Sequence, residues 1–208
     1  MEKNNCDFSP LKEKLKKGLE NISIEVNMGL KTLDNDNFCL LGKLATIKEQ
    51  FEKAEGMAAS FYLNCYLSPF TDKYLDISTS IQHLSNQRHG ALIVIEREDH
   101  LDSFIRPGTV IGAKLTHSLL ESIFYPGNPL HDGAVLVRNS QIFSAANVLP
   151  LSNIIVGEKK LGTRHRAAIG LSEKSDALVL VVSEETGRVS FAMNGELHPI
   201  ITTSSLLV

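Results

Sequence analysis

The chain has 208 residues, of which 43% are hydrophobic, and 21 Lys and Arg against 24 Asp and Glu give a formal net charge of -3. This length allows one sizeable core and a small appendage. The charge balance excludes a general nucleic-acid coat, which needs a broad basic face, and no stretch approaches the ~18 uninterrupted apolar residues of a transmembrane helix.

The N-terminal stretch MEKNNCDFSP lacks the apolar run of a signal peptide. Cys6, Cys39 and Cys65 are odd in number, lie far apart and form no CxxC pair. This pattern predicts neither a disulfide framework nor a zinc site. We therefore expect a protein of the reducing cytoplasm, with no membrane partner.

The first third of the chain predicts two antiparallel helices. Ser9-Pro10 is typical of a helix start, and the polar residues of 29–37 predict a turn. The first apolar stripe comprises Leu11, Leu15, Leu19, Ile22 and Val26. The second comprises Leu40, Leu44, Ile47, Phe51, Ala54, Ala58, Phe61 and Cys65. A hairpin this small buries little surface by itself, so we expect it to dock on the rest of the chain or on another copy.

The remainder predicts an α/β domain. The SPFTD segment at 68–72 marks a boundary, which gives residues 1–68 as a helical region and 69–208 as a second domain. The periodicity predicts helices after Tyr74 and over 114–124. Apolar runs predict strands at 90–96, 134–138, 142–146, 177–182 and 189–193. The expected fold is a mixed central β-sheet flanked by helices.

A first polar cluster, at 131–134, precedes a predicted strand. Asp132 can hold a divalent cation or accept a proton from a hydroxyl. Gly133 and Ala134 remove side-chain bulk, so a ligand can approach the backbone. His131 is either a second metal ligand or a structural histidine. The His-Asp pair of metal phosphohydrolases is excluded, because that pair lies on helices with further ligands, whereas this one leads into a strand.

A second cluster, at 162–166, places Arg164, His165 and Arg166 side by side. Two guanidinium groups on one short loop can grip phosphate oxygens bidentately, and Gly162 and Thr163 add a flexible backbone and a hydroxyl. The alternative is a solvated basic turn. The neighbouring alanines and Ile169 indicate packing, and packed charges need partners. The chain has no GxxxxGK[ST] motif, so a P-loop does not supply the phosphate site.

A third cluster, at 183–187, contains Ser183, Glu184 and Glu185. Adjacent acids in a turn are usually solvated, but beside a nucleotide they can complete a site for Mg²⁺ or Mn²⁺. Together the three clusters predict a nucleotide-polyphosphate site with a divalent metal, and they leave the reaction open.

LHDGAV at 130–135, LGTRHRAAIG at 161–170 and SEETG at 183–187 occur in an order and spacing that resemble the diadenylate cyclase family. GALIVIE at 90–96 and LPLS at 149–152 also agree, and the resemblance covers residues 72–191. The first third is similar to that of the family's soluble, sporulation-associated subtype. The membrane-anchored subtype would carry transmembrane helices, and the DNA-scanning subtype a long DNA-binding extension beyond the position of Val208.

The resemblance implies condensation of two ATP into cyclic di-AMP with release of two pyrophosphates, assisted by Mn²⁺ or Mg²⁺. Asp132 would serve the metal and activate the 3′-hydroxyl, and Gly133 and Ala134 would let the ribose approach. Arg164, His165 and Arg166 would shape the phosphate loop. The remaining nucleotide contacts would be Leu149, near adenine, with Gly162, Thr163, Ser183 and Glu184. The implied metal ligands are His131, Asp132 and Glu184.

One site holds one ATP, so the resemblance implies a homo-oligomer in which two protomers face each other across a two-fold axis. We expect the hairpin to hold protomers in a larger assembly, such as a hexamer, that keeps active sites from facing productively. The competing role is simple stabilisation of the domain. Two other functions remain open, a non-catalytic nucleotide sensor and a phosphohydrolase, and no nucleic-acid partner is expected.

Overall fold

The computed structural model describes residues 9–31, 40–153 and 161–200, without the side chains of residues 9–11. The chain divides into two compact units, Met1–Tyr62 and Leu63–Val208. None of the described helices is both long and apolar enough to cross a membrane.

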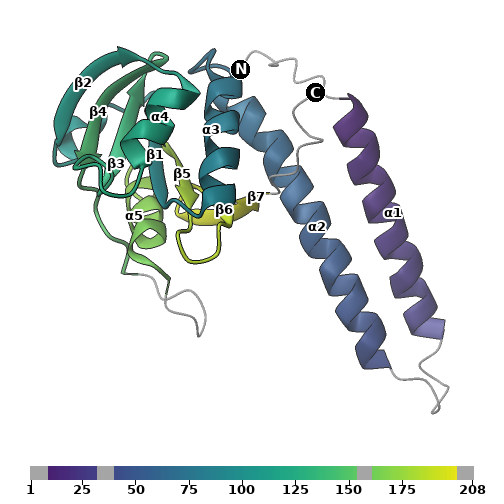
Figure 1. Cartoon of the computed structure of the whole chain (residues 1–208). Coiled ribbons are helices and arrows are strands. Elements are labelled where there is room, and N and C mark those ends of the chain that lie inside the picture. The colour runs from purple at the N-terminus through teal and green to yellow at the C-terminus, as the bar shows by residue number, and fades with distance from the viewer. Residues whose placement is uncertain (1–8, 32–39, 154–160, 201–208) are drawn as a thin grey trace. The chain divides into compact units, whose positions relative to one another are not determined.

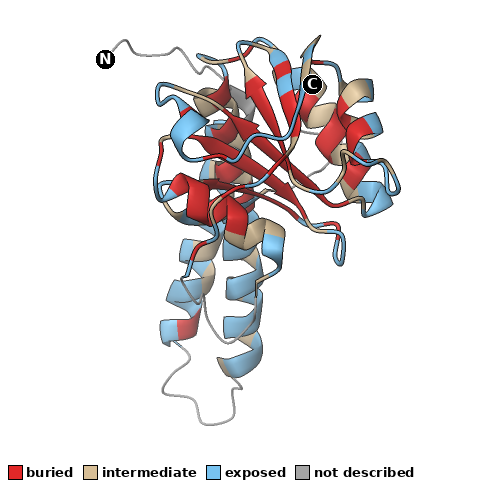
Figure 2. Cartoon of the chain, turned by 90° about the vertical axis from the view of Figure 1, so that its left-hand side faces the viewer, coloured by how far each residue is buried: buried red, intermediate tan, exposed pale blue. Residues whose placement is uncertain are grey.

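The first unit contains α1 (Ser9–Lys31) and most of α2 (Leu40–Leu67). The two helices pack antiparallel, because Lys12 lies over the Phe61 ring and Lys43 is 3.4 Å from Glu25. α1 continues through Gly29 to Lys31, so the turn predicted over 29–37 is wrong for residues 29–31, and the rest of that range lies outside the described residues. Both helices are largely exposed in Figure 2. The predicted stripes are therefore only partly buried, and they leave Leu19, Val26, Leu44 and Phe51 exposed.

The cysteine prediction is wrong at one position. Cys65, near the end of α2, is disulfide-bonded in the structure. The other two cysteines of the chain, Cys6 and Cys39, lie outside the described residues. The sequence argument considered only local CxxC pairs and a framework of several disulfides, and the disulfide at Cys65 belongs to neither pattern.

The second unit is built on a mixed seven-stranded sheet in the order β2-β4-β3-β1-β5-β6-β7. The strands are β1 (Ala91–Ile95), β2 (Thr109–Lys114), β3 (Ala134–Arg138), β4 (Gln141–Asn147), β5 (Leu178–Val182), β6 (Val189–Met193) and β7 (Glu196–Ile200). β1 and β3 are parallel, and the other neighbours are antiparallel. This arrangement confirms the predicted α/β class.

Helices cover both faces of this sheet (Figure 1). α3 (Tyr74–Gln87) and α4 (His117–Phe124) pack on each other at one face, and α5 (Thr163–Ser172) covers the other. The central strands are buried on both faces, as expected for near-continuous apolar runs. On the α5 side the core joins strand residues to Ala167, Ala168 and Leu171.

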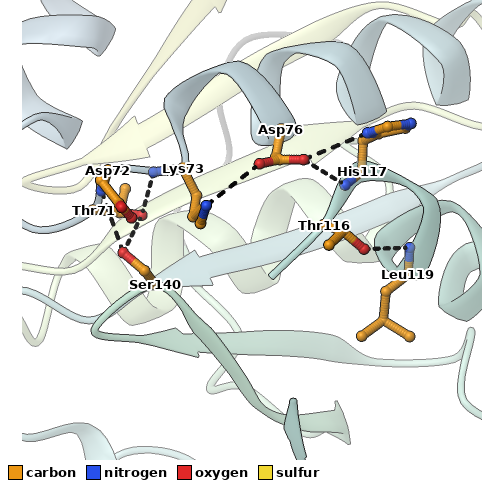
Figure 3. Close-up of polar contacts among 8 residues, drawn as sticks. All are labelled: Thr71, Asp72, Lys73, Asp76, Thr116, His117, Leu119 and Ser140. Carbon is orange, nitrogen blue, oxygen red and sulfur yellow. Dashed lines mark hydrogen bonds and ion pairs between the residues drawn. The ribbon is translucent and has the colours of Figure 1, made fainter. Parts of the chain in front are cut away.

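Polar contacts fix where α3 and α4 begin (Figure 3). Ser140, in the β3–β4 turn, lies 3.1 Å from the Thr71 hydroxyl and accepts from Asp72 N at 3.2 Å. In the first turn of α3, Asp76 accepts from the backbone N–H of His117 at 3.1 Å. Each helix start is thereby tied to a neighbouring element, and the start of α4 also has a local cap.

Two local predictions were wrong, and the two edge strands were not predicted. Residues 114 and 115 are not helical, because β2 ends at Lys114 and α4 is capped by Thr116, whose hydroxyl accepts from Leu119 N. The expected loop at 163–166 is the first turn of α5. No strand was predicted at β2 or at β7, and β7 contains Pro199, a residue that is uncommon inside strands.

Candidate functional site

The three predicted clusters meet at one end of the sheet. Val135 lies beside Ile93, and continuing that register by two residues places Gly133 beside Ala91. Ala91 in turn pairs with Val182, at the end of β5. Neighbouring strands are about 4.8 Å apart, so the backbones of the first and third clusters are roughly 10 Å apart. A nucleotide triphosphate can bridge such a span.

The loop that presents Asp132 is organised by Asn128. The Asn128 amide donates to Ser122 O at 2.8 Å, and its side-chain oxygen accepts from Leu130 N at 2.9 Å. Its carbonyl accepts from the backbone N of His131 at 3.0 Å and lies 2.6 Å from His131 Nδ1. A carbonyl can only accept, so Nδ1 carries a proton and Nε2 of a neutral ring is left as a possible ligand. Asp132 is exposed.

The structure gives a second reason for a glycine at position 133, in addition to the close ligand approach predicted from the sequence. Its φ is +111°, and a Cβ would lie 2.8 Å from the backbone of Ala146 and Asn147. Asn147 is buried, and it donates to Ala134 O while accepting from Gly108 N and the Ser144 hydroxyl. The Asp-Gly turn is thus held against the end of β4.

The second cluster lies at the N-terminus of α5, with Gly162 at the N-cap. The N-cap makes no side-chain capping bond, and the first turn has no acidic residue. A helix N-terminus already carries a partial positive charge and free N–H groups, so arginines there are unfavourable without an anion. The arrangement is suited to phosphate.

Arg164 and Glu184 connect the second and third clusters. Arg164 Nη1 donates to Glu184 Oε2 at 2.7 Å, with 21% of the Arg164 side chain and 62% of the Glu184 side chain exposed. Gly90, just before β1, adjoins this pair, because a Cβ there would lie 2.5 Å from Arg164 Nη1 and 3.0 Å from Glu184 Oε2. Gly90 was not singled out in the sequence, although a glycine that opens a buried strand is a sign of close backbone approach.

Arg166 has a different environment. Its Nε and Nη2 both donate to Ser152 O, at 3.2 and 3.1 Å, and its own carbonyl accepts from Ser152 N at 2.9 Å. The two arginines of the cluster therefore face different partners. Ser152 left no signal in the sequence beyond its place in LPLS.

The other predicted contacts occupy varied positions. Ser183 begins the β5–β6 turn, where its hydroxyl accepts from Thr186 N at 3.3 Å. Thr163 is exposed at the start of α5, whereas Ala134 and Leu149 are buried in the core cluster on the α5 side. A nucleotide contact by Ala134 or Leu149 would therefore involve backbone atoms more readily than side-chain atoms.

The pKa of His165 is lowered, chiefly because the ring is partly buried. Glu185 opposes this shift, and the positive charge of Arg164 adds to it. His165 is therefore neutral at pH 7, which leaves Arg164 and Arg166 as the fixed cations of the cluster.

The donors for a divalent ion are dispersed within one chain. Among the described residues, no three His, Cys, Asp or Glu side chains gather closely enough to hold a metal. Asp132, Glu184 and the Nε2 atom of His131 nevertheless lie around one end of the sheet. This donor set fits Mg²⁺ or Mn²⁺, which commonly take one or two carboxylates and complete their shell with substrate phosphates and water.

Comparison with known proteins gives two family matches. A model described as "DisA bacterial checkpoint controller nucleotide-binding" matches residues 78–197, and one described as "Diadenylate cyclase CdaS, N-terminal" matches residues 1–70. Relatives include "Diadenylate cyclase CdaS" of Bacillus thuringiensis, 54% identical over 91% of this chain and 94% of that one. "Cyclic di-AMP synthase CdaS" of Bacillus subtilis is 51% identical over 92% of each chain.

A solved structure is also similar. The crystal structure titled as a hypothetical membrane spanning protein from Bacillus cereus shares 53% sequence identity and gives a TM-score of 0.77. The match covers 93% of this chain and 95% of that one.

Proposed function

This chain belongs to the diadenylate cyclase family, and we propose that it condenses two ATP molecules into cyclic di-AMP with release of two pyrophosphates. The observation that carries the proposal is the convergence of the Asp132 turn, the N-terminus of α5 and Glu184 at one end of the sheet. The match of residues 1–70 further supports the sporulation-associated subtype.

We propose that Asp132 acts on the nucleophile. In each half-reaction the 3′-oxygen of one ATP attacks the α-phosphorus of the other, its proton leaves, and the bond to the β-phosphate oxygen breaks. An exposed carboxylate on a turn fixed by Asn128 and Asn147 can orient the hydroxyl and accept that proton. The rest of the catalysis is in-line positioning and neutralisation of phosphate charge.

We propose that Arg164 binds the phosphates. It is fixed in charge, partly exposed and adjacent to the N–H groups of the first turn of α5, so both can neutralise the polyphosphate. Gly162 and Thr163 supply backbone and hydroxyl donors at the same helix end, and Ser183 and Glu184 border it. Arg166 has other contacts and is considered below.

A divalent ion, Mn²⁺ or Mg²⁺, would supply charge neutralisation at the phosphates and make the 3′-hydroxyl more acidic. Asp132, Glu184 and the Nε2 atom of His131 are the residues that would hold it, with the phosphates as further ligands. Glu184 now contacts Arg164, so it would be available to the ion only when Arg164 binds the triphosphate instead.

The reaction requires two copies of the chain. The described site has one Asp132 turn and one α5 N-terminus, which suits one ATP, so the 3′-hydroxyl and the α-phosphate of two nucleotides meet only when two sites face each other. We propose a two-fold, face-to-face pair of protomers as the active unit.

The N-terminal helices are proposed to control that pairing. Large apolar side chains remain exposed on both helices at Leu19, Ile24, Val26, Leu30, Leu41, Leu44 and Phe51. Such a surface is expected to be covered by other copies of the chain. We propose that the resulting assembly, such as a hexamer, restrains the catalytic units from facing and so inhibits the enzyme. We also propose that the protein acts in the cytoplasm, where its proposed substrate ATP is found.

The test is product identification. Purified protein with ATP and Mn²⁺ or Mg²⁺ should yield cyclic di-AMP and pyrophosphate without free phosphate. Free phosphate would indicate a phosphohydrolase, and bound but unconverted ATP a nucleotide sensor.

A further inference from the structure

Arg166 directs its guanidinium group at the backbone of Ser152. Nε and Nη2 converge on the Ser152 carbonyl at 3.2 and 3.1 Å, and Ser152 N donates back to Arg166 O at 2.9 Å. Both N–H donors of this guanidinium edge bind the same carbonyl. They are therefore not available to bind phosphate oxygens. The contact also joins the first turn of α5 to the segment that follows β4.

Two further features seat the same segment on α5. The Ser152 hydroxyl donates to Glu173 Oε1 at 2.5 Å, and Ser152 is 1% exposed. Gly170 lies under the segment, because a Cβ there would overlap Pro150 O and lie 2.5 Å from Ser152 N. Residues 150–152 are thus held on α5 by close packing at Gly170, by the buried Ser152 hydroxyl and by the hydrogen bonds from Arg166.

The segment forms part of the site's border. It leaves β4 just after Asn147, which pairs with Ala134 beside the Asp132 turn. Leu149 packs in the core cluster with Ala167 and Ala168 of α5. A displacement of residues 149–152 would therefore shift the end of β4 relative to the start of α5. Arg164, by contrast, lies against Glu184 at the other side of the helix start.

We propose that Arg166 is a positioning residue, which locks residues 149–152 onto α5, and that Arg164 alone of the two arginines binds the phosphates. The second half of this inference rests on the proposed function. The first half concerns the protein without nucleotide and can be tested separately.

The binding test compares ATP with adenosine on the full chain by calorimetry. Arg164→Ala should abolish most of the preference for ATP over adenosine. Arg166→Ala should weaken both ligands by about tenfold, the factor that follows from one lost charged hydrogen bond, and leave their ratio unchanged. Gly170→Ala displaces the same segment without altering any charge, so it should resemble Arg166→Ala. An Arg166→Ala variant that loses affinity for ATP alone overturns the proposal.

Hydrogen exchange of the Ser152 amide, without nucleotide, gives the independent readout. Exchange should accelerate in Arg166→Ala and stay at the wild-type rate in Arg164→Ala. Arg166→Lys, a milder change that keeps the charge and loses the fork, should accelerate it to a smaller extent. Unchanged exchange in Arg166→Ala contradicts the positioning role. If the wild type binds neither ligand, the proposed function fails, while the exchange result still decides the role of Arg166.

Discussion

Arg164 and Glu184 form a 2.7 Å ion pair that links the N-terminus of α5 to the end of β5. They are 20 residues apart in sequence. Considered alone, the cluster of Arg164 could be a solvated basic turn, and the cluster of Glu184 could be a solvated acidic turn. Their contact brings a fixed cation and a candidate metal ligand to one place. Under the proposed function, the pair would separate so that Arg164 binds the phosphates of ATP and Glu184 binds a divalent ion.

Gly90→Ala tests whether the space beside this pair matters. The new Cβ would lie 2.5 Å from Arg164 Nη1, so the guanidinium must move. Displacements of about 1 Å in an active site can reduce turnover by roughly a hundredfold, and we expect a loss of tenfold or more. Steady-state kinetics measure it, with circular dichroism to verify folding.

Gly42→Ala is the matched control. A Cβ at Gly42, near the start of α2, meets nothing within 4 Å. This variant should keep wild-type turnover and gain a little helix stability. Equal activity of the two variants would show that the Gly90 contact has no role in the reaction.

Asp132→Asn should separate binding from chemistry. The substitution keeps the shape of the side chain and removes its charge and basicity, so ATP should still bind. Product formation should fall by roughly a hundredfold or more, the range for loss of a general base. Calorimetry and product chromatography measure the two effects. Cyclic di-AMP at the wild-type rate would exclude Asp132 as the activating group.

His165 should make stability depend on pH. Its pKa is lowered in the folded protein, chiefly by burial, whereas in the unfolded chain it is about 6.5. The unfolded chain therefore binds the proton first, and the free energy of unfolding should fall as the pH drops below about 6.5. The decrease should level off below the folded-state pKa.

His165→Gln removes this contribution. Denaturant unfolding at several pH values between 8 and 5 should show a smaller loss of stability for the variant than for the wild type. A steeper loss in the variant would mean that His165 gains a proton more readily in the folded state, which reverses the sign argued above.

The N-terminal helices should restrain the enzyme through their exposed apolar surface. Deletion of residues 1–66 should reduce the assembly mass in light scattering and raise specific activity. In the full chain, Phe51→Glu should act in the same direction, because Phe51 is 57% exposed. Ala45→Glu, at another exposed position of α2, adds the same charge without removing a large apolar side chain and should change neither quantity. Unchanged mass and activity after the deletion would reject the regulatory role.

The sequence predicted the central strands because each is a short apolar run bounded by polar turns. It did not predict β2, where Gly112 interrupts a largely exposed edge strand. α5 was also missed, because residues 167–172 are buried on all sides and a helix without a polar face shows no amphipathic period.

The motifs supplied the candidate site residues, and the register of β1, β3 and β5 was needed to bring the first and third clusters to the same end of the sheet. The supporting residues could not be predicted, since their contacts join distant parts of the chain. Asn147 reaches Gly108 and Ala134, and Ser152 reaches Glu173. Nothing in the local sequence distinguishes these polar residues from those of an ordinary loop.

The most direct test is a crystal structure with a non-hydrolysable ATP analogue and Mn²⁺. The account predicts one nucleotide per site, with its triphosphate at Arg164 and the first turn of α5, and with Asp132 beside the reacting atoms. Its 3′-hydroxyl should face the α-phosphate of a nucleotide in a second protomer. A nucleotide that contacts Arg164 but leaves Asp132 beyond its reach, in every copy, would contradict it.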